Sequence, residues 1–134
     1  PEDPDKSLSA LGGKVGIAQG YAFDLRDTLL AKNMLVEVGG TTPLRELLLM
    51  LLEGKIKALI DDRNVVTYKA YSMKCARKIQ SAGIAEEPAK LHIGFCPDCK
   101  AEAAFFSQGM DELRASGKLK AVLSNYHLDD WRSK

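Results

Sequence analysis

The sequence has no excess of basic residues. Its 19 Lys and Arg are nearly matched by 18 Asp and Glu, which leaves a net charge of +1 at pH 7. A protein that grips nucleic acid neutralises phosphates with a basic face, and no block of Lys or Arg stands out here. We therefore expect no nucleic-acid partner.

Long hydrophobic runs are missing too. The most apolar run, residues 47–52, contains six residues, whereas a membrane-spanning helix needs about 20. The run is instead typical of a buried helix. Residues 1–5 have neither the basic start nor the apolar stretch of a signal peptide, and we expect residues 1–10 to form an exposed linker.

The common catalytic signatures are also lacking. The sequence contains no Walker A loop, no G-x-G-x-x-G and no G-x-S-x-G elbow. Its two histidines, His92 and His127, are far apart, and neither lies beside a nucleophile. The adjacent carboxylates at 61–62 and 129–130 diverge in a strand or helix, so they make no acid/base couple. We expect no enzyme activity, no cofactor and no metal site.

What is present is enough apolar sequence for about one domain: 134 residues, 46% of them hydrophobic. Strand and helix patterns alternate three times between residues 14 and 75. The predicted strands and helices are 14–18, 22–32, 34–38, 43–53, 55–60 and 63–75. This alternation predicts an α/β fold with a parallel-type sheet flanked by helices.

The pattern changes after residue 75. Residues 76–89 are predicted to be a connector, 91–95 a further strand and 100–115 a helix. A last short helix carries Leu119, Val122, Leu123 and Tyr126.

Ligands of open α/β sheets bind at the carboxyl ends of the strands. This rule selects three loops, residues 19–22, 39–42 and 61–63. Two of them lead into helix N-termini, whose free N–H groups favour a carboxylate, and the third offers carboxylates for an ammonium group. The set suits a zwitterionic ligand. The candidate ligand-binding residues are Gly20, Tyr21, Ala22, Thr41, Thr42 and Asp62.

Several of these residues have purely structural alternatives. Asp62 and Thr42 are each suited to cap the helix that follows them. Tyr21 is also explained by stacking on the surface, and Gly20 by the relief of a turn.

Cys96-Pro97-Asp98-Cys99 lies between a predicted strand and a predicted helix. This is the thioredoxin-like arrangement, in which a helix N-terminus stabilises a thiolate. The 35 residues after Cys99 do not provide the strands and proline turn of such a domain. A zinc site with His92 would need a second Cys/His pair, which is absent. The structural alternatives are a local disulfide between Cys96 and Cys99 or two free thiols.

Three segments in order resemble one known family. They are Leu-Gly-Gly-Lys-Val-Gly-Ile-Ala-Gln-Gly at 11–20, Leu-Glu-Gly-Lys-Ile-Lys-Ala-Leu-Ile-Asp-Asp at 52–62, and Gly-Met-Asp-Glu-Leu-Arg-Ala-Ser-Gly-Lys-Leu at 109–119 followed by Trp131. They are similar to "L-x-G-K-x-V-G-V-x-x-G", "L-x-x-G-x-I-D-A-x-I-x-D" and "L-x-x-S-G-x-L … W" of the polar amino-acid-binding proteins of ABC importers.

That family has the type II periplasmic binding protein fold, two α/β lobes that close on a solute. The resemblance implies that residues 11–82 form lobe two, and that residues 83–134 are a connector and a helical return segment belonging to lobe one. The first part of lobe one has no counterpart here. Asp62 matches the aspartate that pairs with the solute amino group. Gly20, Tyr21 and Ala22 stand where the family has Gly-Thr-Thr.

The resulting expectation is a non-catalytic, periplasmic protein that binds a small polar, amino-acid-like solute for transport, with an ABC permease as its partner. Two alternatives stay open: a thiol–disulfide redox protein that uses the Cys96–Cys99 motif, and a ligand-free interaction or sensor domain. Phe95, Phe105 and Phe106 would leave an apolar surface without lobe one, so self-association is also expected.

Overall fold

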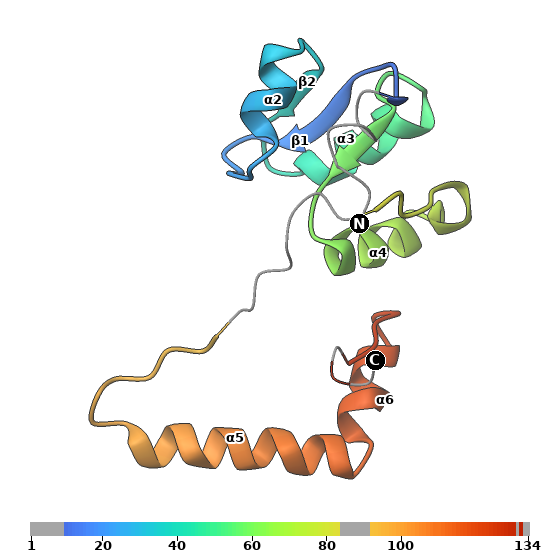
Figure 1. Cartoon of the computed structure of the whole chain (residues 1–134). Coiled ribbons are helices and arrows are strands. Elements are labelled where there is room, and N and C mark those ends of the chain that lie inside the picture. The colour runs from blue at the N-terminus through green and yellow to red at the C-terminus, as the bar shows by residue number, and fades with distance from the viewer. Residues whose placement is uncertain (1–9, 84–91, 131, 133–134) are drawn as a thin grey trace. The chain divides into compact units, whose positions relative to one another are not determined.

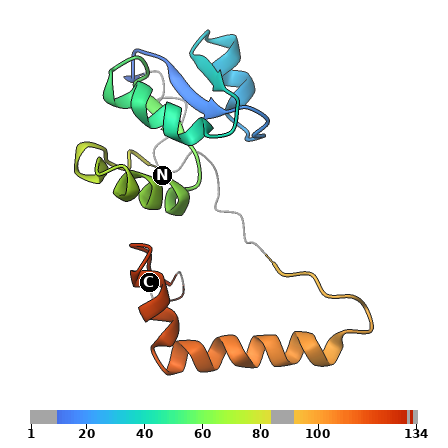
Figure 2. The same ribbon diagram turned by 180° about the vertical axis from the view of Figure 1, so that it is seen from behind.

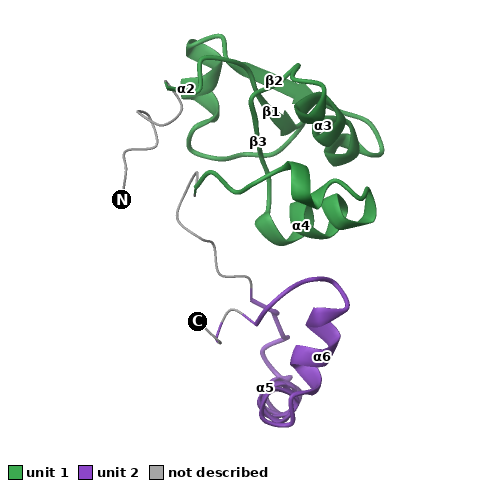
Figure 3. Ribbon diagram, turned by 90° about the vertical axis from the view of Figure 1, so that its right-hand side faces the viewer, with its two compact units in different colours: residues 1–88 green, residues 89–134 purple. Residues whose placement is uncertain are grey.

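The computed structural model describes residues 10–83, 92–130 and 132. The chain divides into two compact units, residues 1–88 and residues 89–134 (Figure 3). Except for Ala10, the predicted linker 1–10 lies outside the described residues. So do residues 84–91 of the predicted connector and strand, and Trp131 of the family motif.

Unit 1 is built around a three-stranded parallel sheet with the strand order β2-β1-β3 (Figure 1). The sheet and its flanking helices confirm the predicted α/β fold. The elements follow one another as β1 (Val15–Ala18), α2 (Arg26–Ala31), β2 (Leu35–Val38), α3 (Pro43–Leu52), β3 (Ala58–Ile60), α4 (Arg63–Ser72) and the short 3-10 helix η1 (Ala76–Lys78).

The central strand β1 is buried along its whole length. Val15 packs against Leu29 of α2 on one face of the sheet. Gly16, which points to the other face, lies under α3: a Cβ on Gly16 would be 2.5 Å from Leu47 Cδ2 and 2.7 Å from Ile56 Cδ1. Glycine in this strand thus lets α3 approach the sheet closely. Helices α2 and α3 therefore cover opposite faces.

Helix α3 explains the apolar run of the sequence. Leu47 and Leu48 are fully buried, and the helix contacts the three strands as well as α4. A helix packed on more than one side needs more than a narrow apolar stripe. Figure 2 shows α3 in front of the strands. Gly54, in the left-handed conformation (φ +73°), follows its C-cap residue, as predicted.

Unit 2 contains α5 (Lys100–Ala115) and α6 (Lys118–Ser124), joined by a turn at Gly117. An ion pair from Arg114 Nε to Asp130 Oδ2, 2.7 Å long, ties the end of the chain to α5. The predicted strand at 91–95 is wrong for its described part, because residues 92–95 form no strand. A strand needs a hydrogen-bonded neighbour, and the described residues of unit 2 provide no sheet for it to join.

Candidate functional site

The three loops selected from the sequence follow strands that are neighbours in one parallel sheet, so they meet at its carboxyl edge. Gln19 N–H donates to Val38 O over 2.8 Å, and Gly39 lies so close to Gln19 that a Cβ there would collide with the Gln19 Oε1 atom. On the other side, Ile17 is paired with Ile60, so Asp61 follows beside Ala18. The three selected loops therefore form one cluster in the structure.

The strand order marks a particular point on this edge. From β1 the chain moves to β2 on one side, and from β2 it crosses to β3 on the other side. The loops after β1 and β3 thus lead away from each other, which makes their junction the topological switch point of the sheet. Gln19 to Ala22 and Asp61-Asp62 are the residues at this junction.

The loop after β1 begins with a tight turn. Tyr21 N–H donates to Ala18 O over 3.3 Å, and Gly20 occupies the third position of the turn with φ +87°. This backbone conformation favours glycine, so the turn itself accounts for Gly20. The Tyr21 side chain is 55% exposed, and Ala22 is exposed as well.

The loop after β2 leads into α3. Thr42 is the N-cap residue of that helix and Pro43 its first residue, as the sequence predicted. The Thr42 side chain, however, makes no capping hydrogen bond, and both Thr41 and Thr42 are exposed. The capping alternative for the Thr42 hydroxyl is thus not realised.

Asp62 caps helix α4, which was the structural alternative to ligand binding for this residue. Its Oδ1 atom accepts hydrogen bonds from the N–H groups of Asn64 (2.8 Å) and Val65 (3.0 Å), which caps the N-terminus of α4. The side chain is otherwise exposed. Much of the hydrogen-bonding capacity of Asp62 is therefore committed to the helix.

Asp61 lies in the selected loop 61–63, although the candidate residues from the sequence included only its neighbour Asp62. It is partly buried at the end of β3, and burial raises the pKa of its carboxyl, while the hydrogen bond from Asp62 N–H to Asp61 Oδ1 (2.7 Å) lowers it and the Asp62 charge raises it. Among the described residues, no Lys or Arg forms an ion pair with Asp61. Its place directly after the strand was the signal that pointed to it.

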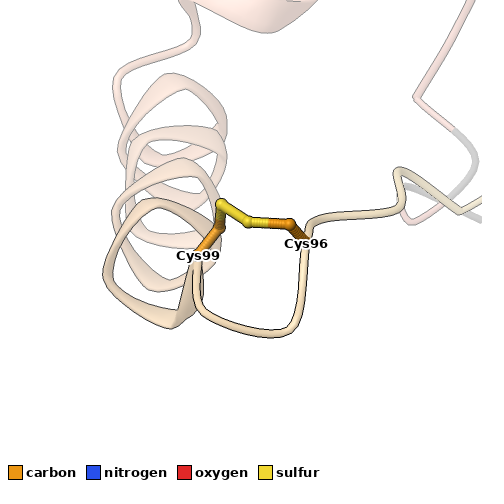
Figure 4. Close-up of a disulfide and its surroundings, with 2 residues drawn as sticks. All are labelled: Cys96 and Cys99. Carbon is orange, nitrogen blue, oxygen red and sulfur yellow. A yellow bond between two sulfur atoms is a disulfide. The ribbon is translucent and has the colours of Figure 1, made fainter.

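The cysteine motif belongs to unit 2. Cys96 and Cys99 are joined by a disulfide (Figure 4), and Cys99 is the N-cap residue of α5. The local disulfide was one of the structural alternatives for this motif. Cys75, in unit 1, is a free and buried thiol.

Within the described ranges, no three His, Cys, Asp or Glu residues come together in a group that could hold a metal ion. Of the helices in that part of the chain, none has the length and apolar character needed to cross a membrane. Comparison with family models, with curated proteins and with solved structures finds no match for this chain. The family resemblance therefore rests on the three sequence segments alone.

Proposed function

We propose that the carboxyl edge of the unit 1 sheet binds a small polar solute that carries an ammonium group, such as an amino acid, without catalysis. The observation that supports this most is Asp61. It is a partly buried carboxylate at the topological switch point that has no cationic partner among the described residues. A buried carboxylate without a counter-charge is unfavourable, and a bound ammonium group would relieve that cost.

The loop before α3 suits the carboxylate end of such a solute. The Thr42 hydroxyl is not used as a cap, and Thr41 beside it is exposed. Both precede the N-terminus of α3, where free N–H groups and the helix dipole favour a carboxylate. Gly20 keeps the neighbouring loop in a tight turn. A zwitterion fits this pair of regions better than a purely anionic ligand.

The proposal assigns different roles to the two aspartates. Asp61 pairs with the solute ammonium group, and Asp62 holds α4 and the loop in place through its capping bonds. The sequence segments at 11–20 and 52–62, which resemble those of ABC-importer binding proteins, support the same solute class. A periplasmic location and a permease partner form part of this proposal.

The test is an amide NMR titration of the chain with a panel of amino acids and related small polar solutes. We expect concentration-dependent shifts clustered in residues 19–22, 39–42 and 61–62. The variant Asp61→Asn, which keeps the shape but removes the charge, should weaken binding about tenfold or more, as expected for loss of a charged partner.

The matched control is Asp62→Asn, because Asn caps a helix about as well as Asp. It should keep most of the affinity. Equal loss in both variants would contradict the assignment to Asp61, and silence of the three loops with the whole panel would overturn the solute-binding proposal.

A further inference from the structure

Helix α5 carries an apolar stripe that the described residues of unit 2 leave uncovered. The stripe consists of Phe105, Phe106, Gly109, Met110 and Leu113, whose spacing of three and one residues places them on one face of the helix. No residue of α5 is buried, and Phe105 is 79% exposed. The stripe lines an open groove of about 920 Å³.

The chain before α5 widens this stripe. The Phe95 ring lies against the Phe106 ring, with 6.0 Å between their centres. The Cys96–Cys99 disulfide restrains the loop between Phe95 and the helix. Phe95 also lines the groove. A continuous apolar surface of this kind, rather than a scatter of single residues, is typical of an interaction site.

The charges at the ends of the groove indicate what covers it. Glu102 lines the groove in the first turn of α5, and Lys118 lines it just beyond the last turn. Neither side chain forms an ion pair within the part of the chain that the structure describes. A second α5 laid antiparallel would bring Glu102 of each copy to Lys118 of the other, whereas a parallel one would bring like charges together.

We propose that the groove binds a second copy of this chain, with the two α5 helices antiparallel and crossing near Gly109. The middle of the stripe permits close approach of a second helix, because Gly109 has no side chain and the space beside it is open: a Cβ added there would meet no atom within 4 Å. An antiparallel pair has a two-fold axis, so the same face serves both partners and closes the assembly as a dimer. Phe105 of one copy then packs near Leu113 of the other.

Sedimentation equilibrium of the full chain at low ionic strength tests this arrangement. The 14.7 kDa chain should double its mass as its concentration rises. Glu102→Lys and Lys118→Glu should each weaken the dimer about tenfold, because two attractive surface pairs become repulsive. The double variant Glu102→Lys/Lys118→Glu should restore the wild-type dissociation constant, since it only exchanges the two charges.

Lys120→Glu is the matched control, because it changes the net charge as Lys118→Glu does but does not line the groove. It should dimerise like the wild type. A wild-type chain that stays monomeric throughout would overturn the proposal and leave the groove to another part of the chain or to another protein. A dimer that the double charge exchange fails to restore would overturn the antiparallel pairing.

Discussion

At the scale of single residues, the two adjacent aspartates show how neighbours in sequence acquire different chemistry. Asp62 is exposed and accepts two backbone hydrogen bonds at the start of α4. Asp61 is partly buried, and burial raises the pKa of its carboxyl. A carboxylate destabilised in this way is typical of sites that bind or react, because the fold tolerates the unfavourable group for the sake of its function.

This difference gives a pH-dependent prediction. The folded-state pKa of Asp61 lies above the ordinary value of 3.8, so the folded state holds its proton more tightly than the unfolded state. The contribution of Asp61 to the free energy of unfolding therefore falls as pH rises from 3.8 through the folded pKa. Without ligand, Asp61→Asn should make unit 1 more stable than the wild type at pH 7, and this gain should shrink as pH falls toward 3.8.

Urea unfolding followed through the β1 amide signals by NMR measures this difference. Asp62→Asn is the control variant: it keeps the cap of α4 and removes the same charge from an exposed position, so its stability shows the effect of losing that charge without a change in burial. An Asp61→Asn variant that is less stable than the wild type at pH 7 would show that the hydrogen bond from Asp62 N–H matters more than the burial of the charge.

The candidate site could be predicted from the sequence in part. The rule that ligands bind at the carboxyl ends of strands selected three loops that lie along one edge of the sheet, because the alternation of strands and helices predicts parallel strands. The sequence could not show that Asp61 is more buried than Asp62, because burial depends on how β3 packs beside β1. The sequence also could not show that the Thr42 hydroxyl makes no capping hydrogen bond, since capping needs a backbone geometry that the residue type does not ensure.

At the scale of elements, the centres were predictable and several of the ends were not. Helix α2 begins at Arg26 and not at residue 22, because a second turn, closed by a hydrogen bond from Arg26 N–H to Phe23 O, comes directly before it. Strand β3 covers 58–60 and not 55–60. The N–H groups of Lys55 and Ile56 both donate to Met50 O at the end of α3, so these two residues belong to the turn after that helix. Helix α5 matched its predicted bounds of 100–115. Local patterns set the element type, whereas the neighbouring turns set its length.

The N-caps of α3 and α4 provide a matched test at this scale. Asp62 accepts two N–H bonds, while Thr42 occupies the same position without a side-chain bond. Asp62→Ala should lower the free energy of unfolding of unit 1 by about 1 kcal/mol, and Thr42→Ala by much less. Urea unfolding at pH 7 compares the two variants directly. Equal losses would mean that the Asp62 side chain stabilises α4 by something other than its capping bonds.

At the scale of the whole molecule, the buried core of the described residues lies in unit 1. Each side chain in the described part that is both large and fully buried lies between Val15 and Ile56, whereas α5 and α6 contain no buried residue. Because hydrophobic burial supplies most of the stability of a fold, the two units should differ widely in their resistance to local opening. Unit 2 is therefore the part whose stability would increase most if a partner covered its apolar surface.

Hydrogen exchange distinguishes the two units and tests the pairing of α5 from another direction. In dilute solution, β1 amides should exchange at least about a hundredfold more slowly than α5 amides, because β1 is buried and bonded on both sides. If α5 pairs with a second copy, its exchange alone should slow as the protein concentration rises. Phe105→Ala should remove that concentration dependence without affecting β1, since Phe105 is largely exposed within its own chain. Exchange in α5 that is slow and independent of concentration would instead mean that the stripe is covered within one chain, and it would contradict the dimer.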